Sequence, residues 1–187
     1  NKGAVQKLAE QGVGLIVTVD CGSVSCEEAD LARELGIKMI VTDHHSIDGR
    51  KADCIVINPK QKEDHYPFDG IAGCGVAFKL CQALQKRTGL PKSVLNEVLD
   101  LLAVGTVADV VPLLDENRTF VKYGLARINA GTRPAMKSLK EGISLKNVAS
   151  ENIAFGIGPH TNAAGRMAEA EEAVQLFMSR DPQTIHR

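Results

Sequence analysis

The chain has 187 residues and a formal net charge of −1, with 44% apolar and 24% charged residues. This composition is typical of one globular domain with a substantial core, and it excludes an intrinsically disordered chain. The longest apolar stretch, residues 101–114, is interrupted by Asp109 and Pro112 and is shorter than the ~18–20 residues of a membrane span, so we expect no membrane association. The five cysteines form no CxxC pair and are odd in number, which disfavours a disulfide framework or a zinc knuckle and favours a cytoplasmic location.

The first part of the chain alternates between helical patterns and short apolar runs rich in β-branched residues. We expect helices at 4–10 and 25–35 and strands at 14–19, 37–42 and 54–57. The second helix begins with a capping-box pattern, Ser25 to Glu28, and ends before Gly36. Continuous apolar strands that alternate with helices are typical of a three-layer, doubly wound parallel α/β sheet. Because the chain starts inside a helix, we also expect that one or more N-terminal strands of this sheet are missing.

From residue 71 onward the apolar residues recur at helical spacing. The expected helices are 73–88, 92–108, 117–130, 134–141, 145–155 and 169–178. We see no internal repeat and no Ser/Pro-rich linker. We therefore expect a parallel α/β core over residues 1–70 and a mainly helical part over residues 71–187, packed together as one domain.

Acidic and imidazole side chains follow two of the predicted strands. Asp20 comes directly after the first strand, and Asp43, His44 and His45 come directly after the second. Ligands of open parallel sheets bind at the carboxyl ends of the strands, so we expect these side chains to share one crevice. Imidazole is a common metal ligand, and a neighbouring carboxylate can fix its tautomer. The alternatives are a solvated His-rich turn for the triplet and a turn-forming or helix-capping role for Asp20.

Asp109 is a third candidate ligand, because it lies within a strongly apolar stretch where an unpaired carboxylate would be costly to bury. Pairing with a cation removes that cost, and a hydrogen bond to a helix terminus is the alternative. Carboxylates and imidazole without a thiolate favour Mn²⁺ or Mg²⁺ over structural zinc. Two such ions serve phosphoryl transfer by activating water and stabilising the attacking and leaving oxygens.

A glycine-rich segment, residues 156–166, holds a second group of candidate functional residues: His160, Asn162 and Arg166. Backbone N–H groups and a guanidinium are suited to binding an anion, although a tight turn with incidental polar residues is an equal alternative. Residues 1–117 carry 12 Lys/Arg against 17 Asp/Glu, whereas residues 118–187 carry 10 against 6. An acidic first part suits a cation and a basic second part suits a polyanion, but an ordinary mixed surface explains the split equally well.

Four segments occur in an order that resembles a known family. They are Val17-Thr-Val-Asp-Cys-Gly22, Val41-Thr-Asp-His-His45, Gly105-Thr-Val-Ala-Asp-Val-Val-Pro-Leu113 and Gly158-Pro-His-Thr-Asn-Ala-Ala-Gly-Arg-Met167. Together they resemble the DHH phosphoesterase superfamily, and within it the RecJ branch of single-stranded-DNA-specific 5′→3′ exonucleases. The Asp-His-His triplet is shared across the superfamily, whereas the last two segments favour the RecJ branch.

The resemblance implies a role for each matching residue. Asp20, His44 and Asp109 correspond to ligands of a two-metal Mn²⁺ or Mg²⁺ site. Asp43 would orient the histidines, and His45 would lie beside the scissile phosphate. The substrate-binding residues would be His160, Asn162 and Arg166, and His160 stands where the family usually has arginine.

The resemblance also implies which parts of the family's catalytic protein are missing from the chain, and which substrate and partner proteins it has. The family's first aspartate motif and its accessory nucleic-acid-binding domain have no counterpart here, so we expect an incomplete catalytic domain that binds metal weakly and hydrolyses little. Single-stranded DNA is the implied substrate, with single-strand-binding protein and a recombination helicase as implied partners. The alternatives are a phosphodiesterase of the same superfamily that acts on short oligonucleotides or cyclic dinucleotides, and a non-catalytic DNA-binding scaffold.

Overall fold

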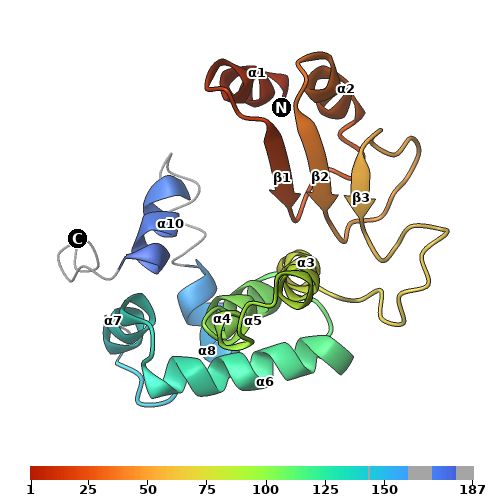
Figure 1. The fold of residues 1–187 in the computed structure, drawn as a ribbon. Coiled ribbons are helices and arrows are strands. Elements are labelled where there is room, and N and C mark those ends of the chain that lie inside the picture. Colours follow the sequence, from red (N-terminus) through yellow and green to blue (C-terminus); the bar gives the residue numbers. More distant parts are fainter. Residues whose placement is uncertain (143, 160–169, 180–187) are drawn as a thin grey trace. The chain divides into compact units, whose positions relative to one another are not determined.

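The computed structural model describes residues 1–142, 144–159 and 170–179, and the chain divides into two compact units, residues 1–90 and 91–187 (Figure 1). The first unit contains the helices α1 (Lys2–Glu10), α2 (Cys26–Glu34) and α3 (Gly73–Thr88) and the strands β1 (Leu15–Val19), β2 (Lys38–Thr42) and β3 (Ile55–Ile57). Among the described residues, no helix is long and apolar enough to cross a membrane.

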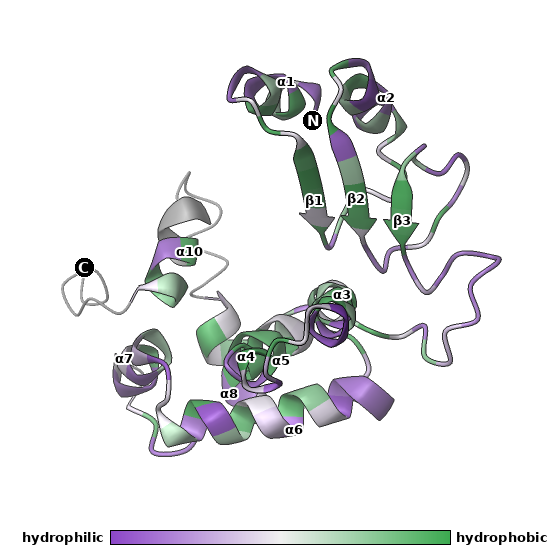
Figure 2. Ribbon diagram, viewed as in Figure 1, coloured by the Kyte–Doolittle hydropathy of each residue, from purple (hydrophilic) through white to green (hydrophobic). Residues whose placement is uncertain are grey.

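The three strands form one parallel sheet in the order β1-β2-β3. The register pairs Val19 with Thr42 and Thr42 with Ile57, so all three strands end at the same level. Helices α1 and α2 pack next to each other on one face of the sheet (Figure 1), and their buried residues form a core with β2. The strands are mainly hydrophobic, whereas the loop that follows β3 is largely hydrophilic (Figure 2). The predicted parallel α/β class is confirmed.

Two local expectations for α2 have different outcomes. Gly36 has a φ of +74°, the left-handed conformation expected of a glycine just beyond a helix. The predicted capping box at Ser25 is wrong, because the Ser25 side chain makes no capping hydrogen bond. The N–H of Ser25 instead donates to the carbonyl of Gly22, so this residue closes the turn after β1.

The second unit is helical, as predicted. Its elements are α4 (Ser93–Asn96), α5 (Leu99–Ala108), α6 (Asp115–Ala130), α7 (Pro134–Gly142), α8 (Ser150–Asn152), the π-helical turn η1 (Ile153–Ile157) and α10 (Ala170–Met178). The single helix expected over residues 92–108 is wrong, because it is divided between α4 and α5. At the break, the carbonyl of Glu97 accepts a hydrogen bond from Arg133 Nη2. The helix expected over 145–155 starts later, at Ser150, and ends as a π-helical turn.

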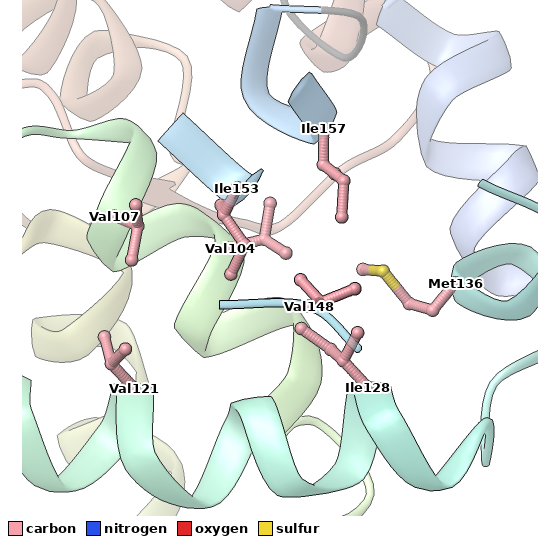
Figure 3. Close-up of a cluster of buried hydrophobic side chains, with 8 residues drawn as sticks. All are labelled: Val104, Val107, Val121, Ile128, Met136, Val148, Ile153 and Ile157. Atoms are coloured by element: carbon pink, nitrogen blue, oxygen red, sulfur yellow. The ribbon is translucent and has the colours of Figure 1, made fainter. Parts of the chain in front are cut away.

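One buried cluster joins the helices of this unit (Figure 3). Residues of α5, α6 and α7 meet residues of η1 and of the segment before α8. The cluster consists of Val104, Val107, Val121, Ile128, Met136, Val148, Ile153 and Ile157. Asp100 is also buried in this unit and binds Arg133, which stands directly before α7.

Gly124 lets α5 and α6 approach closely. A Cβ atom at this position would lie 2.2 Å from the carbonyl oxygen of Leu99 and 2.3 Å from Cβ of Ala103. We expect Gly124→Ala to lower the free energy of unfolding by about 1–3 kcal/mol, because the two helix backbones must move apart. Urea unfolding measures this loss. Gly142→Ala is the matched control, because a Cβ there meets nothing within 4 Å, and equal stability of the two variants would contradict the prediction.

Candidate metal centre

The site lies where β1, β2 and β3 end. The N–H of Asp20 donates to the carbonyl of Thr42 at 2.9 Å, and the N–H of Asp43 donates to the carbonyl of Ile57 at 3.1 Å. Each acidic residue therefore continues the sheet's hydrogen bonding one position beyond its strand. The expectation that Asp20 and Asp43 begin loops at the same edge of the sheet agrees with this geometry.

Asp20 faces the first histidine of the triplet. Its Oδ1 lies 3.1 Å from Nε2 of His44. The His44 side chain is buried, whereas that of Asp20 is 46% exposed. Asp20 has a φ of +63°, a left-handed conformation that is uncommon outside glycine but tolerated by aspartate. The contact thus joins a buried imidazole to a carboxylate at the surface.

Asp43 is 2% exposed, and its carboxylate organises the loop after β2. Oδ2 accepts the N–H of Ser23 at 3.0 Å, and Oδ1 accepts the N–H of His44 at 2.8 Å. Burial by itself raises the pKa of Asp43, but hydrogen bonds from Ser23 and His45 outweigh it and hold that pKa well below its usual range. Asp43 is therefore ionised at neutral pH.

His45 is held in one ring orientation by the same carboxylate. Its Nδ1 lies 2.7 Å from Asp43 Oδ1, and its backbone N–H also donates to that oxygen. Because Asp43 is an anion, Nδ1 carries the proton, and Nε2 is the nitrogen left to bind a ligand. The rings of His44 and His45 meet edge to face with centroids 4.6 Å apart.

Asp20, His44 and His45 each offer one ligand atom, and these atoms lie within 4.8 Å of one another. A carboxylate oxygen and imidazole nitrogens fit Mn²⁺ or Mg²⁺ better than a metal that requires thiolates. Cys21 adds no thiolate to this set. Burial raises the pKa of its thiol, and the nearby carboxylates of Asp43 and Asp20 raise it further.

Asp109 lies in the second unit, directly after α5, where its N–H donates to the carbonyl of Gly105. Its role as a metal ligand stays a prediction. His160, Asn162 and Arg166 lie outside the described residues.

Val110, which follows Asp109, is a strained residue. It has a φ of +60° and is 87% exposed, so its side chain gains little from packing. Left-handed conformations cost a side chain with a Cβ roughly 1–2 kcal/mol. We expect Val110→Gly to raise the free energy of unfolding by about 1 kcal/mol, measured by urea unfolding. Val111 does not have a positive φ, so Val111→Gly should lower the free energy of unfolding. A loss of stability in both variants would contradict this account of Val110.

Asn58 and Ser23 belong to the site, although neither was among the predicted site residues. Asn58 is fully buried, and its Nδ2 donates to Ser23 Oγ and to the carbonyl of His45, both at 2.9 Å. It therefore ties the loop after β1 to the loop after β2. The signal that pointed to Asp20 and Asp43 also applies to Asn58, since it is the polar residue directly after β3.

The parallel sheet, with carboxylates and adjacent histidines at its carboxyl edge, defines an α/β protein with a candidate centre for a divalent metal ion. The N-terminal domain of the DHH family matches residues 2–106, and the chain belongs to this family. The expected membership is thereby confirmed.

The similar proteins are named single-stranded-DNA-specific exonuclease RecJ. The protein from Bacillus subtilis (strain 168) is 42% identical over 184 residues, which cover 97% of this chain and 23% of that protein. The protein from Escherichia coli (strain K12) is 40% identical over 189 residues, which cover 93% of this chain and 32% of that protein. The chain therefore spans about a quarter to a third of the length of these relatives.

Solved structures agree with the sequence relatives. RecJ from Thermus thermophilus in complex with Mn²⁺ superposes with a TM-score of 0.87 at 37% identity, and the match covers 99% of this chain and 28% of that one. A second exonuclease RecJ, bound to manganese, gives a TM-score of 0.84 at 37% identity and covers 96% of this chain and 46% of that one. These matches confirm the predicted fold class.

Proposed function

We propose that this chain carries part of the metal centre of a DHH phosphoesterase that hydrolyses single-stranded DNA from its 5′ end. The observation that carries the proposal is the 3.1 Å approach of Asp20 Oδ1 to His44 Nε2, with His45 beside them. Relatives that are named single-stranded-DNA-specific exonucleases, and structures described with Mn²⁺, support it. A cytoplasmic role in DNA repair and recombination is part of the same proposal.

Asp20 and His44 would hold a divalent Mn²⁺ or Mg²⁺ ion, and Asp109 would supply a further carboxylate. Such an ion, when bound, polarises a phosphoryl oxygen and lowers the pKa of a bound water. His45 would direct its Nε2 toward the scissile phosphate, because Asp43 holds the opposite side of its ring. Asp43 thus acts as an orienting residue: three of its acceptor contacts go to the two histidines, and a fourth goes to the N–H of Ser23.

The substrate contacts proposed for His160, Asn162 and Arg166 rest on the resemblance and on the positive balance of residues 118–187. A phosphate backbone would be bound through the guanidinium of Arg166 and the amide of Asn162. Single-strand-binding protein and a recombination helicase are proposed as partners on the resemblance alone.

The test uses the intact natural polypeptide that contains these 187 residues. We expect Mn²⁺-dependent release of nucleotides from long single-stranded DNA. A blocking group at the 5′ end of the DNA should prevent this release, whereas a blocking group at the 3′ end should not. His44→Ala should reduce the rate at least about 100-fold. Mutating a residue that only hydrogen-bonds to a metal ligand already lowers metal affinity or activity about 10–100-fold, and His44 is itself a proposed ligand. His65→Ala, at an exposed position, is the matched control and should leave the rate unchanged. Cleavage of RNA of two to five nucleotides but not of long DNA would contradict the substrate, and equal rates in both variants would contradict the metal site.

A further inference from the structure

We propose that Gly73 is a positioning residue for Asp20: the missing side chain at the first residue of α3 leaves the space in which the Asp20 carboxylate faces His44. This inference rests on the proposed function, in which Asp20 binds a divalent ion. Gly73 is buried and begins a 16-residue helix. Its φ is not positive, so conformational freedom does not explain why a glycine stands there.

The steric evidence is direct. A Cβ atom at Gly73 would lie 2.1 Å from Oδ1, 2.5 Å from Cγ and 2.6 Å from Cβ of Asp20. All three distances are far below van der Waals contact, so any other residue would require Asp20 or α3 to move. The oxygen in closest conflict, Oδ1, is the atom that lies 3.1 Å from His44 Nε2.

The movement would fall first on the Asp20 carboxylate, whose Oδ1 is the atom in closest conflict. The backbone of Asp20 is held by its hydrogen bond to the carbonyl of Thr42. The side chain of Asp20 is 46% exposed, so rotation can move Oδ1 and Cγ away from the added atom, but rotation leaves Cβ of Asp20 in place at 2.6 Å. A methyl group at Gly73 should therefore displace the carboxylate from His44, and it also requires a small backbone shift that lowers the Tm.

The position also suits an anion electrostatically. Ala72, the residue before α3, offers no side-chain cap, and the first turn of α3 has no acidic residue of its own. The Asp20 carboxylate lies against this end of the helix, where the partial positive charge of the helix dipole attracts a negative group. Gly73 thus admits to the helix terminus an acid that comes from the end of β1.

Gly3 provides a matched comparison. It also lies in the first turn of a helix, α1, but a Cβ there would come no closer than 3.4 Å to another atom, Oδ1 of Asn1. Replacing either glycine by alanine gives the helix a better helix former. Only the change at Gly73 places an atom in the candidate metal centre.

The experiment measures Mn²⁺ binding by calorimetry and thermal unfolding without metal, in the intact protein and in its Gly73→Ala and Gly3→Ala variants. We expect Gly73→Ala to weaken the Mn²⁺ Kd at least 10-fold and to lower the Tm, because the contact with Cβ of Asp20 requires a backbone shift. Gly3→Ala should bind as the wild type does. When Gly73→Ala is added to Asp20→Gly, which removes all three atoms in conflict, the Kd should weaken no further, because both changes act on the same carboxylate.

The outcomes separate this inference from the proposed function. Absence of Mn²⁺ binding by the wild-type protein would overturn both. Wild-type binding that Gly73→Ala leaves unchanged would overturn only the role of Gly73. A further loss of affinity when Gly73→Ala is added to Asp20→Gly would also overturn it, because the effect would then not act through the Asp20 side chain.

Discussion

Replacing Arg133 by methionine is expected to lower the free energy of unfolding by about 3–5 kcal/mol, because it leaves a buried carboxylate without its cation. Asp100 is 1% exposed, and its Oδ2 accepts a hydrogen bond from Arg133 Nε at 2.7 Å. The same guanidinium donates to the carbonyls of Glu97 and Phe177. One side chain therefore joins the ends of α4, α7 and α10 in the second unit.

Urea unfolding measures this loss, with Arg118→Met as the matched control. Arg118 is exposed on α6, so its replacement should change stability by no more than about 0.5 kcal/mol. The double variant Asp100→Leu/Arg133→Met should be more stable than Arg133→Met alone, because no unpaired charge remains. Equal stability of Arg133→Met and Arg118→Met would show that the buried pair does not hold the unit together.

The Asp43→Ala change is expected to cost about 3–5 kcal/mol in the first unit. It leaves the buried backbone N–H groups of Ser23 and His44 without their acceptor, and each such loss costs about 1–3 kcal/mol. Denaturant unfolding without metal measures it. Asp48→Ala, at an exposed position in the same loop, should be near neutral, and a similar loss in both variants would contradict the organising role of Asp43.

We also expect the contribution of Asp43 to the free energy of unfolding to depend on pH. The native pKa of Asp43 is held below its unfolded value of about 3.9, so its ionisation stabilises the fold fully above that pH. As the pH falls below about 4 toward the lower native pKa, this contribution is lost. The stability difference between wild type and Asp43→Asn, measured by urea unfolding at several pH values, should therefore shrink in acid. A difference that grew in acid would contradict the lowered pKa.

Short-range patterns were sufficient to predict the strands and the edge at which the site lies. The apolar runs that end at Asp20 and Asp43 are strands, and their parallel pairing follows from the helices between them. That pairing brings Asp20 and His44 together, which the spacing in the sequence alone does not require.

Tertiary contacts decided the features that the sequence did not reveal. Ser25 has the sequence of a helix cap, but its backbone closes the turn after β1 instead. The break after α4 coincides with a contact to Arg133, 36 residues further along the chain. The close approach of Gly73 to Asp20 joins residues 53 positions apart, and no local pattern marks such a contact.

Mn²⁺ binding by the intact protein, measured by calorimetry beside the variants Asp20→Ala and His44→Ala, tests the central claim most directly. We expect the wild type to bind and both variants to lose at least 10-fold in affinity, whereas Asp48→Ala and His65→Ala bind as the wild type does. Equal affinity in all five proteins, or no binding by the wild type, would contradict a metal centre at the ends of β1 and β2.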